Sequence, residues 1–218
     1  MKCDEVKALI LREKLVIIAR KVPADKLGRV AAALVKGGIK LLEVTFDQTA
    51  ADPAADYAAC IGAIREAVGD ALTLGAGTVQ TPAQVDAAHA AGALYIISPG
   101  TNPAVVKRTK ALGLVSIPGA MTPTEIGAAW EMGADIVKLF PADDLGMHYI
   151  WNIRGPLPHI PLMATGGVNP QTIPEFLSRG IAGVGTGVTV IRRDLLDNDD
   201  YEGIAKLAAE HVAAVKSA

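Results

Sequence analysis

The regular alternation of short apolar segments with helical segments is the feature that most constrains the fold of this chain. Eight apolar segments of strand length occur, and a stretch with helical periodicity or helix-end signals follows each one. Strands that are apolar on both faces and separated by helices belong to a parallel sheet. The segments are, in order, Leu15–Ala19, Lys40–Phe46, Leu72–Thr78, Leu94–Ser98, Leu114–Ile117, Asp135–Pro141, Pro161–Thr165 and Ala182–Gly185.

Eight such units in one uninterrupted series favour a closed (β/α)8 barrel, the TIM barrel, among α/β folds. An amphipathic helix over about residues 3–13 precedes them, with Val6, Leu9 and Ile10 on one side. We therefore expect residues 1–218 to form a single barrel domain. The alternative is an open, Rossmann-like sheet, but no G-x-G-x-x-G motif follows the first strand.

Composition narrows the choice of partners and compartment. Lys and Arg number 21 against 23 Asp and Glu, and aromatic residues make up 4%, which gives no case for nucleic acid or an anionic membrane as partner. Cys3 and Cys60 are far apart without a C-x-x-C motif, and the chain starts without a signal-peptide apolar region or any membrane-length apolar stretch. The expected protein is cytoplasmic and binds a small polar metabolite.

The four histidines lie in separate segments without the spacing of metal ligands. We expect them at surface or loop positions, and we expect no metal site. The histidines are His89, His148, His159 and His211.

A lysine lies within the sixth apolar segment, and it needs a physical reason to be there. Side chains alternate along a strand, so Ile136, Lys138 and Phe140 share one face. A buried ammonium group is costly unless it is paired or loses its proton. Lys138 is therefore either half of a structural ion pair or a desolvated amine that can attack a carbonyl group to form a Schiff base.

Two more charged residues are in phase with this lysine. Arg20 ends the first strand, and Glu43 lies in the second on the face of Leu41 and Thr45. All three would meet at the carboxyl ends of the strands, where TIM barrels carry their chemistry. Arg20 could hold a carboxylate and lower the pKa of Lys138, while Glu43 could transfer protons. The structural alternative is a Lys138–Glu43 ion pair with Arg20 at the surface.

Two glycine clusters follow the seventh and eighth strands. Glycine lets backbone N–H groups approach an anion closely, and TIM barrels often bind phosphate in these two loops. The clusters therefore predict a phosphate site, although turns between strands and helices need glycine in any case. The candidate binding residues are Gly166, Gly167, Gly185 and Thr186.

Seven short motifs occur in an order that is typical of one enzyme family. They are Glu43-Val44-Thr45-Phe46, Gly75-Ala76-Gly77-Thr78, Ile97-Ser98-Pro99-Gly100, Ile117-Pro118-Gly119, Met121-Thr122-Pro123-Thr124-Glu125, Val137-Lys138-Leu139-Phe140-Pro141 and Thr165-Gly166-Gly167-Val168. From about Leu15 to Gly187 the chain resembles the 2-keto-3-deoxy-6-phosphogluconate (KDPG) / 4-hydroxy-2-oxoglutarate (KHG) aldolases.

The resemblance implies a class I pyruvate aldolase, an aldehyde-lyase that needs no cofactor or metal. Such an enzyme cleaves a 2-keto-3-deoxy (phospho)sugar acid or 4-hydroxy-2-oxoglutarate into pyruvate and an aldehyde, glyceraldehyde 3-phosphate or glyoxylate. Family members are commonly homotrimers, so the resemblance also predicts a homotrimer. Two other functions stay open, a sugar-phosphate isomerase or epimerase and a non-catalytic metabolite-binding barrel.

The resemblance also assigns roles to individual residues. Lys138 would form the Schiff base with pyruvate, and Glu43 would be the general acid/base. Thr78 would help to hold the pyruvyl carboxylate, Phe140 would pack against the pyruvyl group, and Pro99 would line the pocket.

Two positions depart from the pattern of the family. Asp47 stands where many members carry a carboxylate-binding arginine, and Arg20, at the end of the first strand, can take that role as it does in another branch. Val188 stands where the family usually offers a hydroxyl group to the phosphate. Either backbone amides and Thr186 hold the phosphate, or the substrate lacks one.

Overall fold

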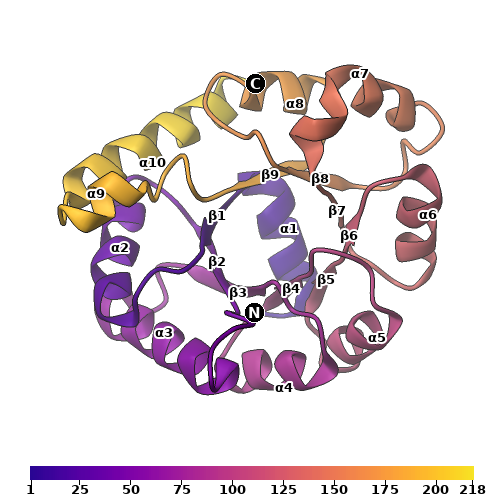
Figure 1. Cartoon of the computed structure of the whole chain (residues 1–218). Coiled ribbons are helices and arrows are strands. Elements are labelled where there is room, and N and C mark those ends of the chain that lie inside the picture. The colour runs from indigo at the N-terminus through magenta and orange to yellow at the C-terminus, as the bar shows by residue number, and fades with distance from the viewer.

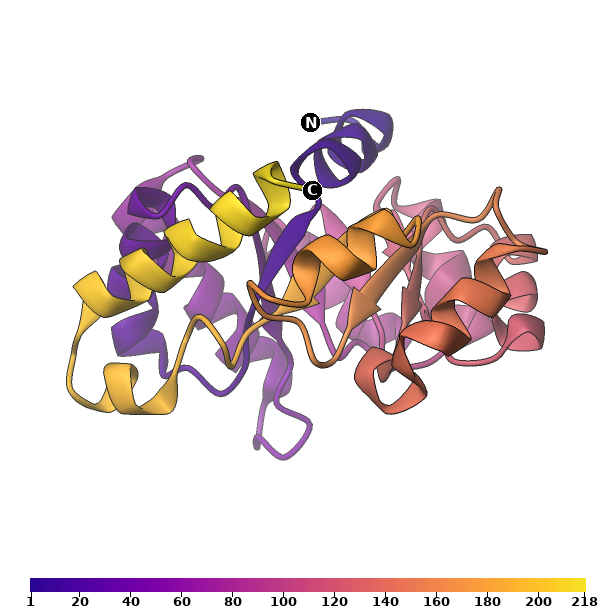
Figure 2. The ribbon, with the colours of Figure 1, turned by 90° about the horizontal axis from the view of Figure 1, so that it is seen from above.

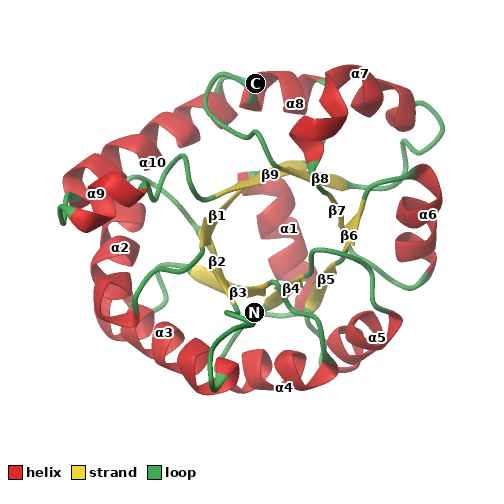
Figure 3. Ribbon diagram, in the orientation of Figure 1, coloured by secondary structure: helices red, strands yellow, loops and turns green.

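The computed structural model describes residues 1–218, apart from the side chain of Leu145. Its strands form a central ring that the helices surround (Figure 1 and Figure 3). The strands are β1 (Leu15–Ala19), β2 (Leu41–Thr45), β3 (Thr73–Gly77), β4 (Tyr95–Ile97), β5 (Val115–Ile117), β6 (Gly119–Ala120), β7 (Val137–Leu139), β8 (Leu162–Thr165) and β9 (Gly183–Thr186). The helices are α1 (Cys3–Glu13), α2 (Ala24–Lys36), α3 (Pro53–Val68), α4 (Pro82–Ala90), α5 (Pro103–Ala111), α6 (Pro123–Glu131), α7 (Ala142–Arg154), α8 (Ile173–Ser178), α9 (Arg193–Asp197) and α10 (Tyr201–Lys216).

The strand order β5-β4-β3-β2-β1-β9-β8-β7-β6, with parallel pairing throughout, confirms the predicted (β/α)8 barrel. Nine strands appear where the sequence predicts eight, because the short strand β6 follows Pro118, beyond the end of the fifth predicted strand at Ile117. Pro118 therefore separates β5 from β6. Proline has no N–H group to donate to a ladder. The backbone N–H groups of Asp135 and Lys138 donate to the carbonyl oxygens of Ser116 and Pro118, both at 2.9 Å, and so link this broken strand to the β7 segment.

The first helix closes the amino-terminal end of the barrel. Helix α1 has the predicted bounds, and Val6 and Ile10 are buried in the cluster of side chains that fills the barrel interior. Figure 2 shows α1 at one end of the molecule, with β1 pointing away from it. The carboxyl ends of the strands therefore form the open mouth of the barrel.

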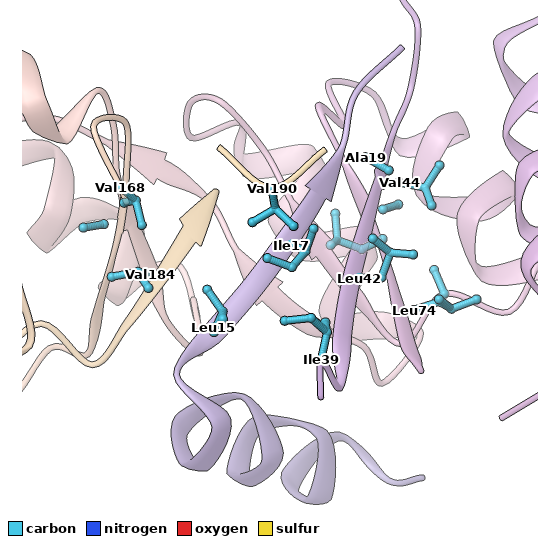
Figure 4. Close-up of a cluster of buried hydrophobic side chains, with 14 of the residues drawn as sticks. Leu15, Ile17, Ala19, Ile39, Leu42, Val44, Leu74, Val168, Val184 and Val190 are labelled. Carbon is cyan, nitrogen blue, oxygen red and sulfur yellow. The ribbon is translucent and has the colours of Figure 1, made fainter. Parts of the chain in front are cut away.

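Two apolar layers follow the alternation of side chains along each strand. Outward-facing residues, among them Ile17, Leu42 and Val184, pack in the layer between the strands and the helices (Figure 4). Their inward-facing neighbours, such as Val16 and Leu41, fill the barrel interior. This phasing agrees with the one predicted from the sequence, and it directs the side chains at positions 43 and 138 into the barrel.

Four of the outer helices begin with the same local signal, a polar capping side chain followed by proline. The caps are Asp52, Thr81, Asn102 and Thr122, and each accepts a hydrogen bond from a backbone N–H group of its helix. These helices follow the carboxyl ends of β2, β3, β4 and β6, so the caps fix the loops at the barrel mouth. Among the helices described, none combines the length and apolarity that a bilayer crossing requires.

Candidate active site

A buried amine and a buried carboxylate lie inside the barrel near its mouth. The side chain of Lys138 is 5% exposed and that of Glu43 is 1% exposed. Strand pairing fixes both positions, because Lys138 lies between Gly119 and Met163 and Glu43 pairs with Ile18 on β1. The sequence prediction that both residues face inward agrees with this placement.

Two glycine residues of β3 provide the space for the Glu43 carboxylate and for the ring of Tyr95 on β4. A Cβ atom on Gly77 would overlap with Oε1 of Glu43, and a Cβ atom on Gly75 would overlap with the ring of Tyr95. The Gly-Ala-Gly sequence therefore has a steric role, since any larger residue at Gly77 would displace the carboxylate.

Burial and the neighbouring opposite charge act in opposite directions on the pKa of Glu43 and on the pKa of Lys138. Burial raises the pKa of Glu43, while the charges of Lys138 and Arg20 act in the opposite direction. Burial lowers the pKa of Lys138 and Arg20 adds to this effect, whereas Glu43 opposes it. The net result is a lysine that loses its proton more readily than usual and a carboxyl group that keeps its proton more readily.

Lys138 and Glu43 do not form an ion pair in the described structure, and Oε1 of Glu43 has no hydrogen-bond partner among the described residues. A structural ion pair should satisfy both of its charged groups. The geometry therefore weighs against the purely structural alternative for Lys138.

Arg20 and Thr78 lie together at the rim of the mouth. Arg20 is exposed, and its Nη2 donates a hydrogen bond to Oγ1 of Thr78 at 3.2 Å. The backbone of Thr78 has a φ of 57°, in the left-handed region that β-branched residues rarely adopt, and Gln48 Nε2 donates to its carbonyl oxygen at 2.8 Å. Strain of this kind persists where the surrounding structure enforces it, often at functional sites.

Phe140 forms one wall beside the amine. The centroid of its ring is 4.6 Å from Nζ of Lys138, and the side chain is 38% exposed. The aromatic face can therefore pack against a group bound to this amine.

A cavity of about 540 Å³ extends from Lys138 and Arg20 to the loops that follow β8 and β9. Its volume is in the range of small-molecule sites. Seven of the ten predicted site residues line it, namely Arg20, Lys138, Phe140, Gly166, Gly167, Gly185 and Thr186. Two others adjoin its lining residues, because Glu43 acts electrostatically on Lys138 and Thr78 bonds to Arg20.

Pro99 differs from the prediction that it lines this pocket. It is exposed and lines a neighbouring cavity of about 400 Å³, which shares only Phe140 with the first. Two local contacts hold this segment. The Pro99 carbonyl packs so closely on Gly119 that a Cβ atom on Gly119 would overlap with the carbonyl oxygen. Thr101 Oγ1 also donates a hydrogen bond to the Gly119 carbonyl at 2.9 Å. The chain after β4 therefore packs on β6, and Pro99 faces the neighbouring cavity.

The sequence interpretation missed Asp143, an exposed residue in the first turn of α7 that lines the cavity. Its side chain packs against Gly166 and Gly167, which have φ values of 109° and 65°. Both glycines are thus required, by the positive φ and by the contact with Asp143. The position of Asp143 just after the sixth predicted strand was the available signal.

A hydrogen-bonded chain ties the far wall of the cavity to helix α10. Thr186 Oγ1 donates to the carbonyl oxygen of Val168 at 3.0 Å and is 2.7 Å from Oγ1 of Thr189. Thr189 in turn is 3.0 Å from Nε2 of His211, and Nδ1 of His211 donates to the Leu207 carbonyl at 2.7 Å. The expectation that the histidines lie at the surface is therefore wrong for His211, which is 1% exposed.

Val188 projects from the rim of the same cavity and is 79% exposed. The nearby Thr186 hydroxyl is already bonded within the wall. Among the described residues, no three His, Cys, Asp or Glu side chains come together in a group that could hold a metal ion.

Comparison with known proteins places this barrel among aldolases. Residues 6–207 match the family model described as KDPG and KHG aldolase. A 2-dehydro-3-deoxy-6-phosphogalactonate aldolase from Escherichia coli is 32% identical over 205 residues, covering 94% of this chain and 95% of the relative. A 2-dehydro-3-deoxy-phosphogluconate aldolase from Treponema pallidum is 39% identical over 166 residues, covering 73% and 76%.

The solved structure of a KDPG aldolase from Legionella pneumophila, with pyruvate captured at low pH as a covalent carbinolamine intermediate, is similar with a TM-score of 0.81. It is 27% identical, with coverage of 93% of this chain and 96% of that one. Fold, site and relatives together define an enzyme that is a carbon–carbon lyase. The chain belongs to the KDPG and KHG aldolase family.

Proposed function

We propose that this protein is a class I pyruvate aldolase in which Lys138 forms a Schiff base with the substrate. The substrate is a 2-keto-3-deoxy sugar acid, with or without a phosphate group, or 4-hydroxy-2-oxoglutarate. The products are pyruvate and an aldehyde, either glyceraldehyde 3-phosphate or glyoxylate. The observation that carries this proposal is that the amine of Lys138 is buried beside the buried carboxylate of Glu43. Burial lowers the pKa of this amine.

The first half of the reaction uses the neutral amine of Lys138. Its lone pair attacks the keto carbon, and the carbinolamine loses water to give an iminium ion. Glu43 takes the proton of the substrate hydroxyl on the fourth carbon as the bond between the third and fourth carbons breaks. The bonding electrons move into the iminium system, which becomes an enamine, and the aldehyde leaves.

The second half returns the proton. Glu43, now protonated, donates to the third carbon of the enamine, and hydrolysis of the resulting pyruvyl iminium ion frees pyruvate and the amine. A carboxyl group with a raised pKa suits both steps, because it takes up a proton more readily than an ordinary glutamate and can return it in the second step. In this scheme Arg20 and Thr78 hold the substrate carboxylate and Phe140 packs on the pyruvyl group.

The aldehyde half of the substrate extends toward the loops that follow β8 and β9. In the proposal the backbone N–H groups around Gly166, Gly167 and Gly185 bind its far end, with Thr186 in the wall. The charged residues that line the cavity are Arg20, Lys138 and Asp143. In the proposal Arg20 and Lys138, the positively charged residues that line the cavity, bind the pyruvyl half. A comparison of kcat/KM for phosphorylated and unphosphorylated keto-deoxy acids therefore tests whether the aldehyde half carries a phosphate group.

The oligomeric state and compartment are part of the proposal. A cytoplasmic homotrimer is the state that the resemblance predicts. A related chain, 30% identical with a TM-score of 0.82, belongs to a protein cage designed by fusing symmetric oligomeric domains. Light scattering after gel filtration should give three times the 22.6 kDa of one chain.

Borohydride reduction in the presence of pyruvate tests the chemistry directly. We expect a reduced pyruvyl adduct on the peptide that contains Lys138, and its absence would refute the Schiff-base mechanism. A Lys138→Ala variant should fold, lose the adduct and lose pyruvate release, whereas a Lys107→Ala variant, which removes an exposed amine on α5, should behave as the parent. Isomerisation without pyruvate release would support a sugar-phosphate isomerase or epimerase. Ligand binding without turnover would support a non-catalytic metabolite-binding barrel.

A further inference from the structure

Three buried side-chain oxygen atoms have no hydrogen-bond partner among the described residues. They are Oε1 of Glu43 and the hydroxyl oxygens of Tyr57 and Tyr95. Buried polar atoms nearly always have a partner, from the protein or from ordered water, because leaving them without one is costly. The proposed mechanism uses Glu43 but gives neither tyrosine a role.

Tyr95 lies in the barrel interior next to the catalytic carboxylate. Strand pairing places Glu43, Gly75 and Tyr95 in one row across β2, β3 and β4. The tyrosine ring occupies the space above Gly75, and the carboxylate occupies the space above Gly77. These two glycines are successive positions on one face of β3, about 7 Å apart.

A single water molecule can bridge two oxygen atoms that lie up to about 5.6 Å apart, because it forms two hydrogen bonds of about 2.8 Å each. Such a bridge would give a partner to both Oε1 of Glu43 and the hydroxyl group of Tyr95. Tyr57 lies in the outer layer, where its ring stacks on Phe46 with 4.5 Å between centroids.

We propose that Tyr95 is a positioning residue for this reaction, whose phenol donates through one buried water to Glu43 and holds the carboxylate ready for proton transfer. The inference rests on the proposed role of Glu43 as the general acid/base. It adds a partner on β4 to the carboxylate on β2.

The groups that act on Glu43 differ in what happens to them during the reaction. Lys138 from β7 and Arg20 after β1 favour its charged form, but the substrate occupies both of them. Burial, with a contribution from Glu43, raises the pKa of Tyr95 well above its usual value, so the phenol remains a protonated donor. Burial, with a further contribution from Glu43, also raises the pKa of Tyr57 on α3, so this phenol in the outer layer stays uncharged.

A Tyr95→Phe variant tests the proposal because it deletes one oxygen atom and keeps the ring. Infrared difference titration, with a Glu43→Gln variant to identify the carboxyl band, measures the pKa of Glu43 without substrate. We expect Tyr95→Phe to raise this pKa by about one unit, since a lost hydrogen bond disfavours the carboxylate. The acid limb of the pH profile for hydrogen exchange at the pyruvate methyl group should move by the same amount.

The matched control is Tyr57→Phe, which removes the same atom from an equally buried phenol on the other side of the sheet, and we expect it to leave the pKa of Glu43 in place. An unchanged pKa in Tyr95→Phe together with a raised Tm would overturn the proposal. That result would mean that the hydroxyl has no partner and only destabilises the fold. An equal shift in Tyr57→Phe would also overturn the assignment to Tyr95. Failure of the proposed function would instead appear as no pyruvate adduct on Lys138, a result independent of the infrared titration.

Discussion

Gly77 should be a residue at which a single added methyl group greatly slows catalysis while the fold survives. The Cβ atom of a Gly77→Ala variant would occupy the place of Oε1 of Glu43. The backbone of Gly77 is ordinary strand, so alanine is conformationally allowed there. The substitution therefore acts through the displaced carboxylate.

Two opposing terms set the cost to stability. Overpacking a buried site costs about 1–3 kcal/mol, while replacing a strand glycine with alanine returns roughly 0.5–1 kcal/mol. We expect a net loss of about 1–2 kcal/mol in the free energy of unfolding. The effect on turnover should be much larger, since a displacement of about 1 Å at a catalytic group can cost about 100-fold.

The assay separates the two steps of the mechanism. Lys138 is untouched, so borohydride should still trap pyruvate on the Gly77→Ala variant, while kcat for aldol cleavage should fall about 100-fold. Adding Glu43→Asp shortens the side chain by one methylene group and relieves the overlap, so the double variant should recover about tenfold in kcat over Gly77→Ala.

Gly62→Ala is the control, because that glycine is exposed on α3 and has no atom within 4 Å of an added Cβ. It should be slightly more stable than the parent and equally active. Full activity of Gly77→Ala, or a double variant no better than Gly77→Ala, would refute the steric role assigned to this glycine.

Three further predictions follow from other contacts. Arg20→Leu should lower kcat/KM for keto-acid cleavage by about 10- to 100-fold, mostly through KM, because it removes the charge-assisted hydrogen bond that we propose to the substrate carboxylate. An unchanged KM would contradict the proposed role of Arg20. Asp135→Ala should lower the unfolding free energy in urea by about 2 kcal/mol, because the carboxylate bonds to Lys110 and to the Ser116 N–H group at 2.6 and 2.9 Å where the broken strand meets the β7 segment. Burial lowers the pKa of His211, so just below pH 6.5 the unfolded chain binds more protons than the folded chain. The free energy of unfolding should therefore fall as the pH drops from 6.5 toward the folded-state pKa. A His211→Gln variant should lose that part of the pH dependence, and an equal slope in both proteins would exclude His211 as its source.

The alternation of apolar and helical segments was sufficient to predict the barrel, because period-two strands and proline-initiated helices are local properties of the sequence. The inward direction of Glu43 and Lys138 followed from the same period. The short strand β6 after Pro118 was not predicted, because it depends on pairing with β7 rather than on a local pattern in the sequence.

Contacts between distant segments explain the remaining differences. Pro99 lines the neighbouring cavity, where its carbonyl packs on Gly119, and Asp143 enters the first cavity because two glycines leave it space. His211 is buried because Thr189 and the Leu207 carbonyl satisfy both of its ring nitrogens. None of these pairings has a signal in local periodicity, so the sequence pattern alone could not reveal them.

Helix α1 has a consequence for the order of events at the site. Val6 and Ile10 are buried at the amino-terminal end of the barrel, so in the proposed reaction substrate and products pass through the mouth at the carboxyl ends of the strands. In the proposed reaction the pyruvyl group is bound at the deeper position, and the aldehyde lies between it and solvent. The aldehyde should therefore leave first and pyruvate last, so that pyruvate inhibits competitively with the substrate and the aldehyde inhibits noncompetitively.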